Sequence, residues 1–328
     1  MIRITSFDIR TEKNQTTSLD ELAAVLADPN QIVWLDFENE PVESAEPILL
    51  NIFKFHHLAV DDALEESHVP KIDDWGDYLY IVLNAITIEH NDSISLHTHE
   101  LDIFLGKNYL VTHHDDSMPF IEKTWTNLAR DTRPYKYGPD RLLYKLIDDM
   151  VSEYMTQVDL LDDEMDLIED EVLTKAKPDT LERIFAIKRM VLSMRRIFGP
   201  QREVLNKLAR DDYEVIDPAE RIFFRDIYDH LVRIHDLNEN MRDLISGALE
   251  TYLSVINNRM NEVMKTLTII TTLFMPLTFL TGFFGMNFFE PAGHLGVWTD
   301  TAAFALTLAV VLITPIAMFL YMRKRSWL

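Results

Sequence analysis

The sequence predicts an α+β membrane protein with an N-terminal α/β cytosolic domain, a stalk of long helices and two C-terminal transmembrane helices. Three observations predict this class: two long uncharged segments near the C-terminus, β-type runs in the first hundred or so residues, and helical spacing of apolar residues beyond them. The bounds that these patterns favour are 1–118 for the α/β domain, 119–264 for the helical region, 265–288 and 301–322 for the spans, 289–300 for the external loop, and 323–328 for a basic tail.

The two uncharged segments, 266–289 and 301–322, hold about 24 and about 22 residues, and each is long enough to cross a hydrocarbon core. Core helices of soluble proteins rarely run this long without a charge, so the alternative of two buried helices is disfavoured. The loop between the spans contains no Lys or Arg, whereas the basic tail follows the second span directly. The positive-inside rule therefore predicts a multi-pass protein of the plasma or inner membrane with both termini in the cytoplasm.

Short runs rich in β-branched and aromatic residues predict strands in the N-terminal domain, with a hairpin turn at Gly106-Lys107-Asn108 between the last two. These strands are expected at 31–37, 78–87, 101–105 and 109–112, with a helical pattern at 58–64. Apolar residues three or four positions apart then predict long helices at 139–174 and 179–210 and a third that starts near Pro218. Nothing strong interrupts the third pattern, so we expect one helix that continues into the bilayer.

Composition excludes several classes of protein. The chain has 328 residues, a formal net charge of -23 and no cysteine, which rules out disulfides, thiolate metal sites and cysteine nucleophiles. Binding of nucleic acid needs clustered basic residues, so the acidic excess argues against that partner and favours cations. The sequence contains no Walker-type glycine loop, no Gly-x-Ser-x-Gly and no His-Glu-x-x-His, so we expect no enzyme. We also expect no secretory signal peptide at the amino terminus.

The first span carries small, hydroxyl and thioether side chains on one face. At 100° per residue, six of them fall within an arc of roughly 80°: Met264, Thr268, Thr271, Met275, Thr278 and Gly282. Such a stripe suits a helix that lines a water-filled axis, although small residues also serve ordinary helix packing. Gly285, Met286 and Asn287 follow, and the Asn oxygen suits a hydrated cation; taken alone, this tripeptide is also an ordinary helix C-cap.

Residues 261–288, which end in Gly-Met-Asn, closely resemble the CorA family of magnesium transporters, whose signature is this tripeptide at the end of the first of two spans. The tail 323–328 and the segment 224–230 fit the same family, and the resemblance covers nearly the whole chain. It implies a funnel-shaped homopentamer whose pore is formed by five copies of the first span. It also implies Mg²⁺ as the transported and regulatory ion, transport of Co²⁺ and Ni²⁺ as well, and no organic cofactor. The partners it implies are the lipid bilayer, divalent ions and other copies of the chain, with no nucleic acid.

Carried over residue by residue, the resemblance assigns roles to individual positions. Asn287 would form the entrance ring, positioned by Gly285 and Met286. The conduit would be lined by Glu250 at the inner mouth, Asn261, Met264, Leu267, Met275, Thr278 and Gly282, and the helical phase adds Thr268 and Thr271 to this face. Regulatory metal would bind between neighbouring subunits at Asp61, Asp62, Asp226, Asp229 and His230. Carboxylates that face one another repel unless a divalent ion bridges them, so low internal metal would loosen the ring and open the gate.

Several alternatives stay open. Many relatives that carry magnesium show a Met-Pro-Glu-Leu loop after Gly-Met-Asn, which this chain lacks, so the choice of ion is unsettled. A zinc transporter of the same family is one alternative, because His97 and His99 project to one side of a strand and His113-His114 lies nearby. A second is a membrane-anchored acidic metal sensor without a pore.

A further acidic cluster repeats at helical spacing within the predicted helix 139–174. It comprises Asp159, Asp162, Asp163, Asp166 and Asp170. Asp162 and Asp166 are candidates for a secondary metal site. The other interpretation is a solvated face balanced by bases such as Lys188, Arg189, Arg195 and Arg196.

Overall fold

The computed structural model describes residues 1–64, 69–90, 94–286 and 301–325. Contacts group the chain into two compact units, Met1–Tyr252 and Leu253–Leu328. The first unit contains the sheet and the long helices packed on it. The second contains the C-terminal part of one helix and a separate final helix. Each unit is considered by itself below.

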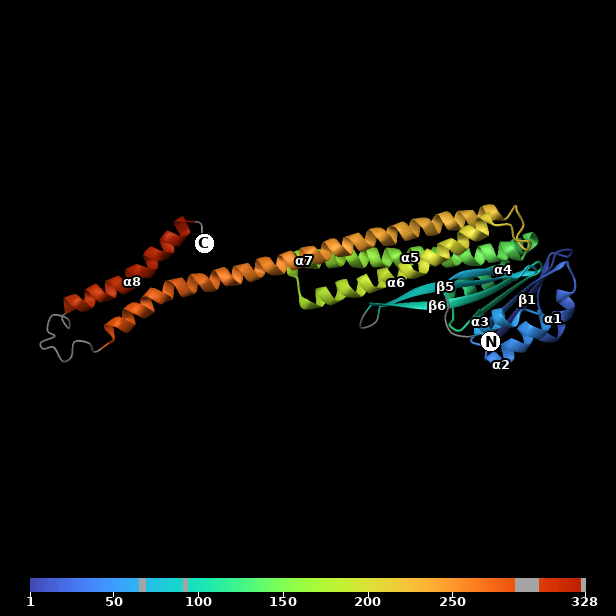
Figure 1. The fold of residues 1–328 in the computed structure, drawn as a ribbon, viewed down its shortest axis with the longest axis horizontal. Coiled ribbons are helices and arrows are strands. Elements are labelled where there is room, and N and C mark those ends of the chain that lie inside the picture. Colours follow the sequence, from blue (N-terminus) through green and yellow to red (C-terminus); the bar gives the residue numbers. More distant parts are fainter. Residues whose placement is uncertain (65–68, 91–93, 287–300, 326–328) are drawn as a thin grey trace. The chain divides into compact units, whose positions relative to one another are not determined.

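One mixed sheet organises the first unit (Figure 1). Its strands are β1 (Ile2–Asp8), β2 (Lys13–Thr16), β3 (Gln31–Glu38), β4 (Lys71–Asp74), β5 (Tyr78–His90), β6 (Ile94–Gly106) and β7 (Tyr109–His114), in the spatial order β2-β1-β3-β7-β6-β5-β4. Neighbours pair antiparallel except β3 and β7, which are parallel. The four predicted strands are confirmed as β3, β5, β6 and β7, whereas β1, β2 and β4 were missed.

The predicted hairpin between β6 and β7 is confirmed, and its glycine has a steric cause. A Cβ added at Gly106 would overlap the Cζ atom of Tyr109, so any side chain there would collide with the Tyr109 ring. The Asn108 amide group in the turn donates to the carbonyl oxygen of Leu26 at 3.1 Å. The turn is thereby tied to the helix that precedes β3.

Helices cover both faces of the sheet. One face packs against α1 (Leu19–Leu26), α2 (Val42–Pro47), a π-helical turn (Ile48–Ile52) and α3 (His57–Leu64). The other face packs against α4 (Pro119–Arg130), a 3-10 turn (Arg133–Tyr137), α5 (Pro139–Lys175) and α6 (Pro178–Arg210). The Tyr154 hydroxyl on α5 donates to the carbonyl of Asn84, and the backbone N–H of Asn84 donates to the side chain of Gln201 on α6. Both long helices are therefore fixed to β5.

The long helices confirm the helical periodicity. The third predicted helix is α7 (Arg221–Phe284), which is continuous over 64 residues, and the last is α8 (Thr301–Lys324). The part of α7 that precedes Tyr252 packs on α5 and α6, on the side away from the sheet (Figure 1). Asn238 on α7 donates to the carbonyl of Val191 on α6, and its side chain is buried. Within the first unit, α5 and α6 therefore lie between α7 and the sheet.

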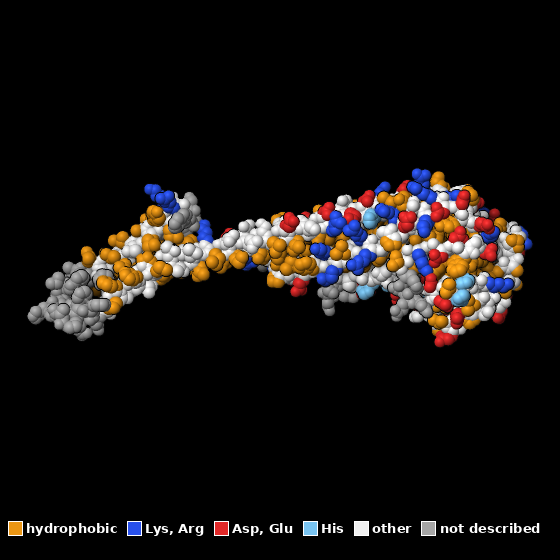
Figure 2. Space-filling view, in the orientation of Figure 1, with side chains coloured by type: hydrophobic (Ala, Val, Ile, Leu, Met, Phe, Trp, Pro, Cys, Tyr) orange, Lys and Arg blue, Asp and Glu red, His pale blue; other side chains and the backbone are white. Residues whose placement is uncertain are grey.

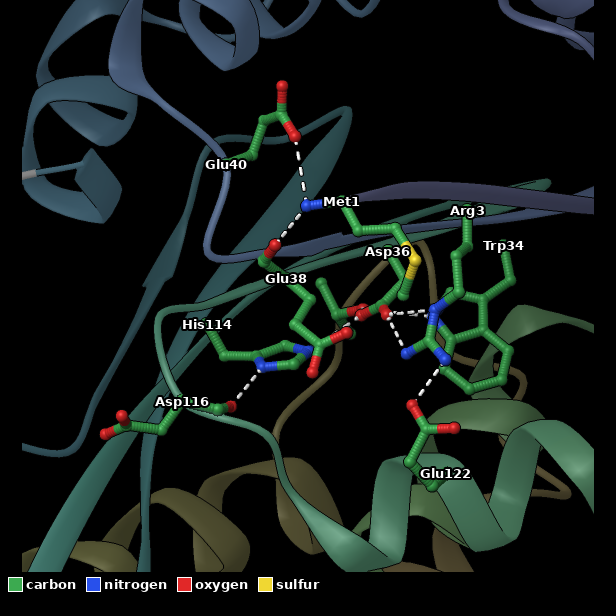
Figure 3. A network of polar contacts seen from close by, with 10 residues as sticks. Met1, Arg3, Trp34, Asp36, Glu38, Glu40, His114, Asp116 and Glu122 are labelled. Carbon is green, nitrogen blue, oxygen red and sulfur yellow. Dashed lines mark hydrogen bonds and ion pairs between the residues drawn. The ribbon is translucent and has the colours of Figure 1, made fainter.

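A buried ionic network joins the neighbouring strands β1, β3 and β7 (Figure 3). The carboxylate of Asp36 on β3 has no exposed surface and accepts hydrogen bonds from Arg3 on β1 and from Thr112 on β7. His114 donates from Nε2 to Asp36 at 3.2 Å and from Nδ1 to the carbonyl of Asp116 at 2.6 Å. An imidazole that donates from both nitrogens is the charged form. Asp36 therefore pairs with two cations, the buried His114 and the partly buried Arg3, and Arg3 also pairs with Glu122.

The pKa directions agree with that geometry. Burial alone would lower the pKa of His114, but the hydrogen bond and charge of Asp36 raise it above its ordinary value. Burial alone would raise the pKa of Asp36, but His114, Thr112 and Arg3 lower it. The Asp36 contribution to stability is present above the ordinary carboxyl pKa of about 4, and the His114 contribution is complete below about pH 6.5. The latter is lost as the pH rises through the raised pKa of His114.

We predict that Asp36→Asn lowers the free energy of unfolding by about 3–5 kcal/mol near pH 6, because it leaves His114 buried without a counter-charge and leaves Arg3 with Glu122 as its remaining partner. The difference in stability between the variant and the wild type should shrink as the pH rises, because His114 then loses its proton and its ion pair with Asp36 in the wild type. Thermal unfolding of the full-length protein in detergent, followed by circular dichroism from pH 5.5 to 9, measures both effects. The control is Glu43→Gln, which removes an exposed carboxylate on α2. An Asp36→Asn protein as stable as this control at pH 6 would contradict the account.

Candidate ion pathway and metal-binding residues

The C-terminal part of α7 and nearly all of α8 are apolar, and this chain does not bury them. The most apolar stretch of each helix is long enough to cross a membrane, and no part of either stretch is buried among the described residues. Figure 2 shows hydrophobic side chains without charged ones over these segments, and basic residues at the end of α8. Core helices of a soluble protein would be covered. The two segments therefore have the character of membrane spans, as the sequence predicted.

The predicted conduit face is exposed throughout the described chain. Met264, Leu267 and Met275 are 55%, 57% and 66% exposed. Glu250, Asn261, Thr268, Thr271, Thr278 and Gly282 are exposed as well. A Cβ added at Gly282 would meet nothing within 4 Å, so this chain's own packing does not require a glycine there. The structure brings all of these residues onto one helix.

The threonines of this face present hydrogen-bond acceptors. The hydroxyls of Thr268, Thr271 and Thr278 donate to backbone carbonyls one turn earlier in the helix, at 2.7, 2.9 and 2.9 Å. Each donor is thereby used within the helix, and the lone pairs of each oxygen stay available. Water bound to a cation points its hydrogens outward. A row of acceptor oxygens therefore suits a cation that keeps its water shell.

α7 ends just before the predicted signature tripeptide. The backbone N–H of Gly285 donates to the carbonyl of Thr281 at 2.9 Å, and that of Met286 donates to Phe283 at 3.3 Å. A Cβ at Gly285 would lie 3.0 Å from the carbonyl oxygen of Thr281, so a glycine eases the chain's exit from the helix. Asn287 and the predicted loop 289–300 lie outside the described residues.

The predicted regulatory residues lie on two elements that one chain keeps apart. Asp61 and Asp62 are on α3, which covers one face of the sheet, whereas Asp226, Asp229 and His230 are on α7. The sheet and the helices α5 and α6 lie between them (Figure 1). Within the described ranges, no three His, Asp or Glu side chains converge at metal-binding distances. A metal ion that joins α3 to α7 therefore needs residues of two chains.

Three of the four histidines considered for zinc, His99, His113 and His114, line one cavity, but the four do not form a set of metal ligands. His97 contacts Ser95 at 3.1 Å, whereas His99 contacts Thr87 at 2.8 Å and Asp116 at 2.7 Å. His113 lies beside Asp102, with 3.9 Å between the imidazole Nδ1 and the nearer carboxylate oxygen. His114 belongs to the Asp36 network. His97 and His99 share a strand as predicted, and His99 and His114 both contact Asp116, but no three of these side chains and their acidic neighbours form a set of metal ligands among the described residues.

The second acidic cluster is exposed on α5. Asp162 and Asp166 make no ion pair among the described residues. The balancing bases were expected on α6, but Arg195 pairs with Glu239 on α7 instead, at 3.0 Å. The cluster is therefore a solvated acidic face, and no direct ion pair with α6 neutralises it in the described part of the chain.

Sequence reasoning missed Lys71 on β4. Its ammonium group forms an ion pair with Asp62 and lies 3.3 Å from a carboxylate oxygen of Asp73. The alternation Lys71-Ile72-Asp73 places Lys71 and Asp73 on one face of a strand, which is the signal that could have revealed it. One proposed metal ligand therefore already has a cationic partner within its own chain.

We predict that cysteines on the conduit face react much faster with a small charged thiol reagent than cysteines on the opposite face. Because the chain has no cysteine, each single variant carries one unique thiol. Thr271→Cys and Thr278→Cys should react at least about tenfold faster than Leu273→Cys and Leu280→Cys, since a thiol ionises only in contact with water. Labelling of the reconstituted full-length protein by a methanethiosulfonate, read by mass spectrometry, measures the rates. Equal rates at all four positions would remove this face from the aqueous pathway.

Comparison with known proteins agrees with the fold and the two spans. A family model described as CorA-like Mg²⁺ transporter protein matches residues 29–324. The cobalt/magnesium transport protein CorA of Thermotoga maritima is 32% identical over 333 residues, which cover 100% of this chain and 92% of the relative. The complete structure of the CorA magnesium transporter from Methanocaldococcus jannaschii has a TM-score of 0.83 at 21% identity. It covers 100% of this chain and 99% of that one, and it confirms the fold.

A zinc-transporting relative is also similar. The zinc transport protein ZntB of Yersinia pseudotuberculosis is 24% identical over 306 residues, which cover 92% of this chain and 90% of the relative. The match to the family model spans most of this chain, and a relative above 30% identity covers all of it. The chain therefore belongs to the CorA-like Mg²⁺ transporter family, and it is a divalent cation transporter of the membrane and not an enzyme.

Proposed function

We propose that five copies of this chain form a channel that passes Mg²⁺ through a pore lined by the C-terminal part of α7, with both termini in the cytoplasm. The observation that carries this proposal is the exposed face from Met264 to Gly282, with its outward-facing threonine oxygens. Copies of that face around one axis give a passage lined by acceptors and thioethers. α8 would then lie outside the pore helix, with its uncovered apolar surface toward lipid.

The chemistry of this face favours a hydrated hard cation. Mg²⁺ loses its water reluctantly, and neutral acceptors hold the hydrated ion weakly enough for it to leave again. The carbonyl oxygen of Asn287 would extend the same chemistry to the outer entrance. Glu250 would add negative charge at the inner mouth, where it attracts cations.

Zinc is the second candidate, supported by the similarity to ZntB. Zn²⁺ prefers imidazole and thiolate ligands, but residues 253–293 contain neither His nor Cys. Within the described ranges, the histidines of the first unit form no group of three metal ligands with one another or with acidic residues. Magnesium is therefore the better match to the residues of this chain. We extend the same proposal to Co²⁺ on the strength of the cobalt/magnesium name of the Thermotoga relative, and to Ni²⁺ on the resemblance to the family alone.

Regulation would act at the contacts between subunits. Asp61 and Asp62 on α3 of one copy would face Asp226, Asp229 and His230 on α7 of the next, because no single chain brings the two elements together. These carboxylates repel one another across the contact until a divalent ion bridges them. High cytosolic Mg²⁺ would hold the ring closed, and its depletion would let the subunits separate and the pore open.

We predict that liposomes containing the full-length protein take up Mg²⁺ faster than Zn²⁺ under equal gradients. An ion-sensitive dye inside the vesicles measures both rates. Thr278→Phe should reduce Mg²⁺ uptake at least about tenfold by filling the conduit, whereas Leu273→Phe adds its volume on the opposite helix face and should leave uptake near the wild-type rate. Faster Zn²⁺ uptake would favour the zinc transporter. No uptake of any divalent ion would favour a sensor without a pore.

We predict that Asp226→Asn raises the internal Mg²⁺ concentration needed for half-closure on the order of tenfold, because one carboxylate ligand is lost. Patch recordings with defined Mg²⁺ on the cytosolic side measure this concentration. Asp236→Asn, which removes another exposed carboxylate from the same helix, is the matched control and should close as the wild type does. Identical closure of both variants would remove Asp226 from the regulatory site.

A further inference from the structure

The ion pair of Lys71 with Asp62 places a fixed positive charge at one of the proposed regulatory ligands. Lys71 begins β4, the edge strand, and its backbone is held opposite Val82 of β5. Its ammonium group pairs with Asp62 of α3, and the two side chains are 30% and 39% exposed. The contact is therefore open enough for an ion from solution to reach it.

The ammonium group has other partners on its own sheet. A carboxylate oxygen of Asp73, two residues along β4, lies 3.3 Å away. The centroid of the Tyr80 ring on β5 lies 5.1 Å away, within the range of a cation–π contact. Asp73 lies directly opposite Tyr80 in the strand pairing, so both partners sit on the sheet beside Lys71. If Asp62 is taken by another cation, Lys71 keeps a carboxylate and an aromatic face.

The charge of Lys71 persists at neutral pH. Burial alone would lower the pKa of Lys71, but the hydrogen bond that its ammonium group donates to Asp62 and the charge of Asp73 raise it. A group that stays cationic competes with any other cation for the same carboxylate. The ammonium group of Lys71 is tethered beside Asp62, so its local concentration there is fixed by the fold. The concentration of free Na⁺ or K⁺, by contrast, changes with the medium.

We propose that Lys71 is a built-in competitor of the regulatory divalent ion, which occupies Asp62 when the ion is absent and moves onto Asp73 and Tyr80 when the ion binds. Lys71 thereby sets the Mg²⁺ concentration at which neighbouring subunits are bridged. This inference rests on the proposed regulatory role of Asp62. It goes beyond that role because it names a residue that tunes the site without contacting the metal.

Lys71 weakens the binding of Mg²⁺ at Asp62 in two ways. Its charge repels an approaching Mg²⁺, and its ion pair must be exchanged before Asp62 can coordinate. Partly exposed ion pairs are weak, so the exchange is readily reversible. A strong buried pair such as Arg3 with Asp36 would instead keep the carboxylate from the metal altogether.

The test measures Mg²⁺-dependent protection of the full-length protein from limited proteolysis in detergent. Lys71→Met should lower the half-protecting Mg²⁺ concentration by about two- to fivefold, which is the range expected for a partly exposed ion pair. Lys71→Arg keeps the charge and should stay close to the wild type. Asp73→Asn removes the alternative partner of Lys71 and should raise the half-protecting concentration.

A double variant separates competition from a general change in charge. When Asp62→Asn is already present, adding Lys71→Met should shift the half-protecting Mg²⁺ concentration much less than Lys71→Met does in the wild type. A full shift in that background would overturn the competition. So would a higher Mg²⁺ requirement of the single Lys71→Met variant, which would make Lys71 a residue that orients Asp62.

The outcome for the wild type separates this inference from the proposed regulation. If Mg²⁺ protects the wild type and Lys71→Met leaves the midpoint unchanged, the role of Lys71 is refuted and regulation by divalent ions stands. If Mg²⁺ does not protect the wild type at all, the regulatory role of Asp62 fails, and the role of Lys71 fails with it. Circular dichroism of each variant confirms that protection is compared between folded proteins.

Discussion

The C-terminal part of α7 exposes Met264, Leu267 and Met275 beside a row of threonines, and no part of the described chain covers them. Apolar surface on this scale needs lipid or other protein, and hydroxyl oxygens need water or a polar partner. A helix face that needs both protein contacts and water finds them where several copies of the helix surround a water-filled axis. The membership of the chain in a family of divalent cation transporters is consistent with that arrangement. The proposed channel, its selectivity and its regulation all depend on this face.

The first unit combines charges that are satisfied within the chain with charges that are not. Asp36 is saturated by Arg3, Thr112 and His114 and links β1, β3 and β7. Asp226, by contrast, is exposed on α7. Asp62 lies between these extremes, because its partner Lys71 has a second carboxylate available. A network that is buried and complete stabilises the fold, whereas an exposed and exchangeable one leaves room for an ion.

Much of this architecture could be predicted from the sequence, for identifiable reasons. β3, β5 and β7 are apolar and mostly buried, so their composition reveals them, and α5 and α6 repeat apolar residues every three or four positions. β2 and β4 lie at the two ends of the sheet and consist mostly of polar residues, so nothing in their composition distinguishes them from loops. The Asp36 network joins residues 33 to 78 positions apart, and no local pattern reports such contacts. Lys71 was missed because its partner Asp62 lies on a different element.

The central claim is that the face from Met264 to Gly282 surrounds an axial passage in an assembly of five chains. An electron cryomicroscopy map of the full-length protein in lipid nanodiscs with Mg²⁺ tests this most directly. The account predicts five α7 helices around a continuous passage, with Thr271 and Thr278 toward the axis and α8 on the lipid side. A map in which this face is turned to lipid, or is closed in a solid helix contact without a passage, would contradict it.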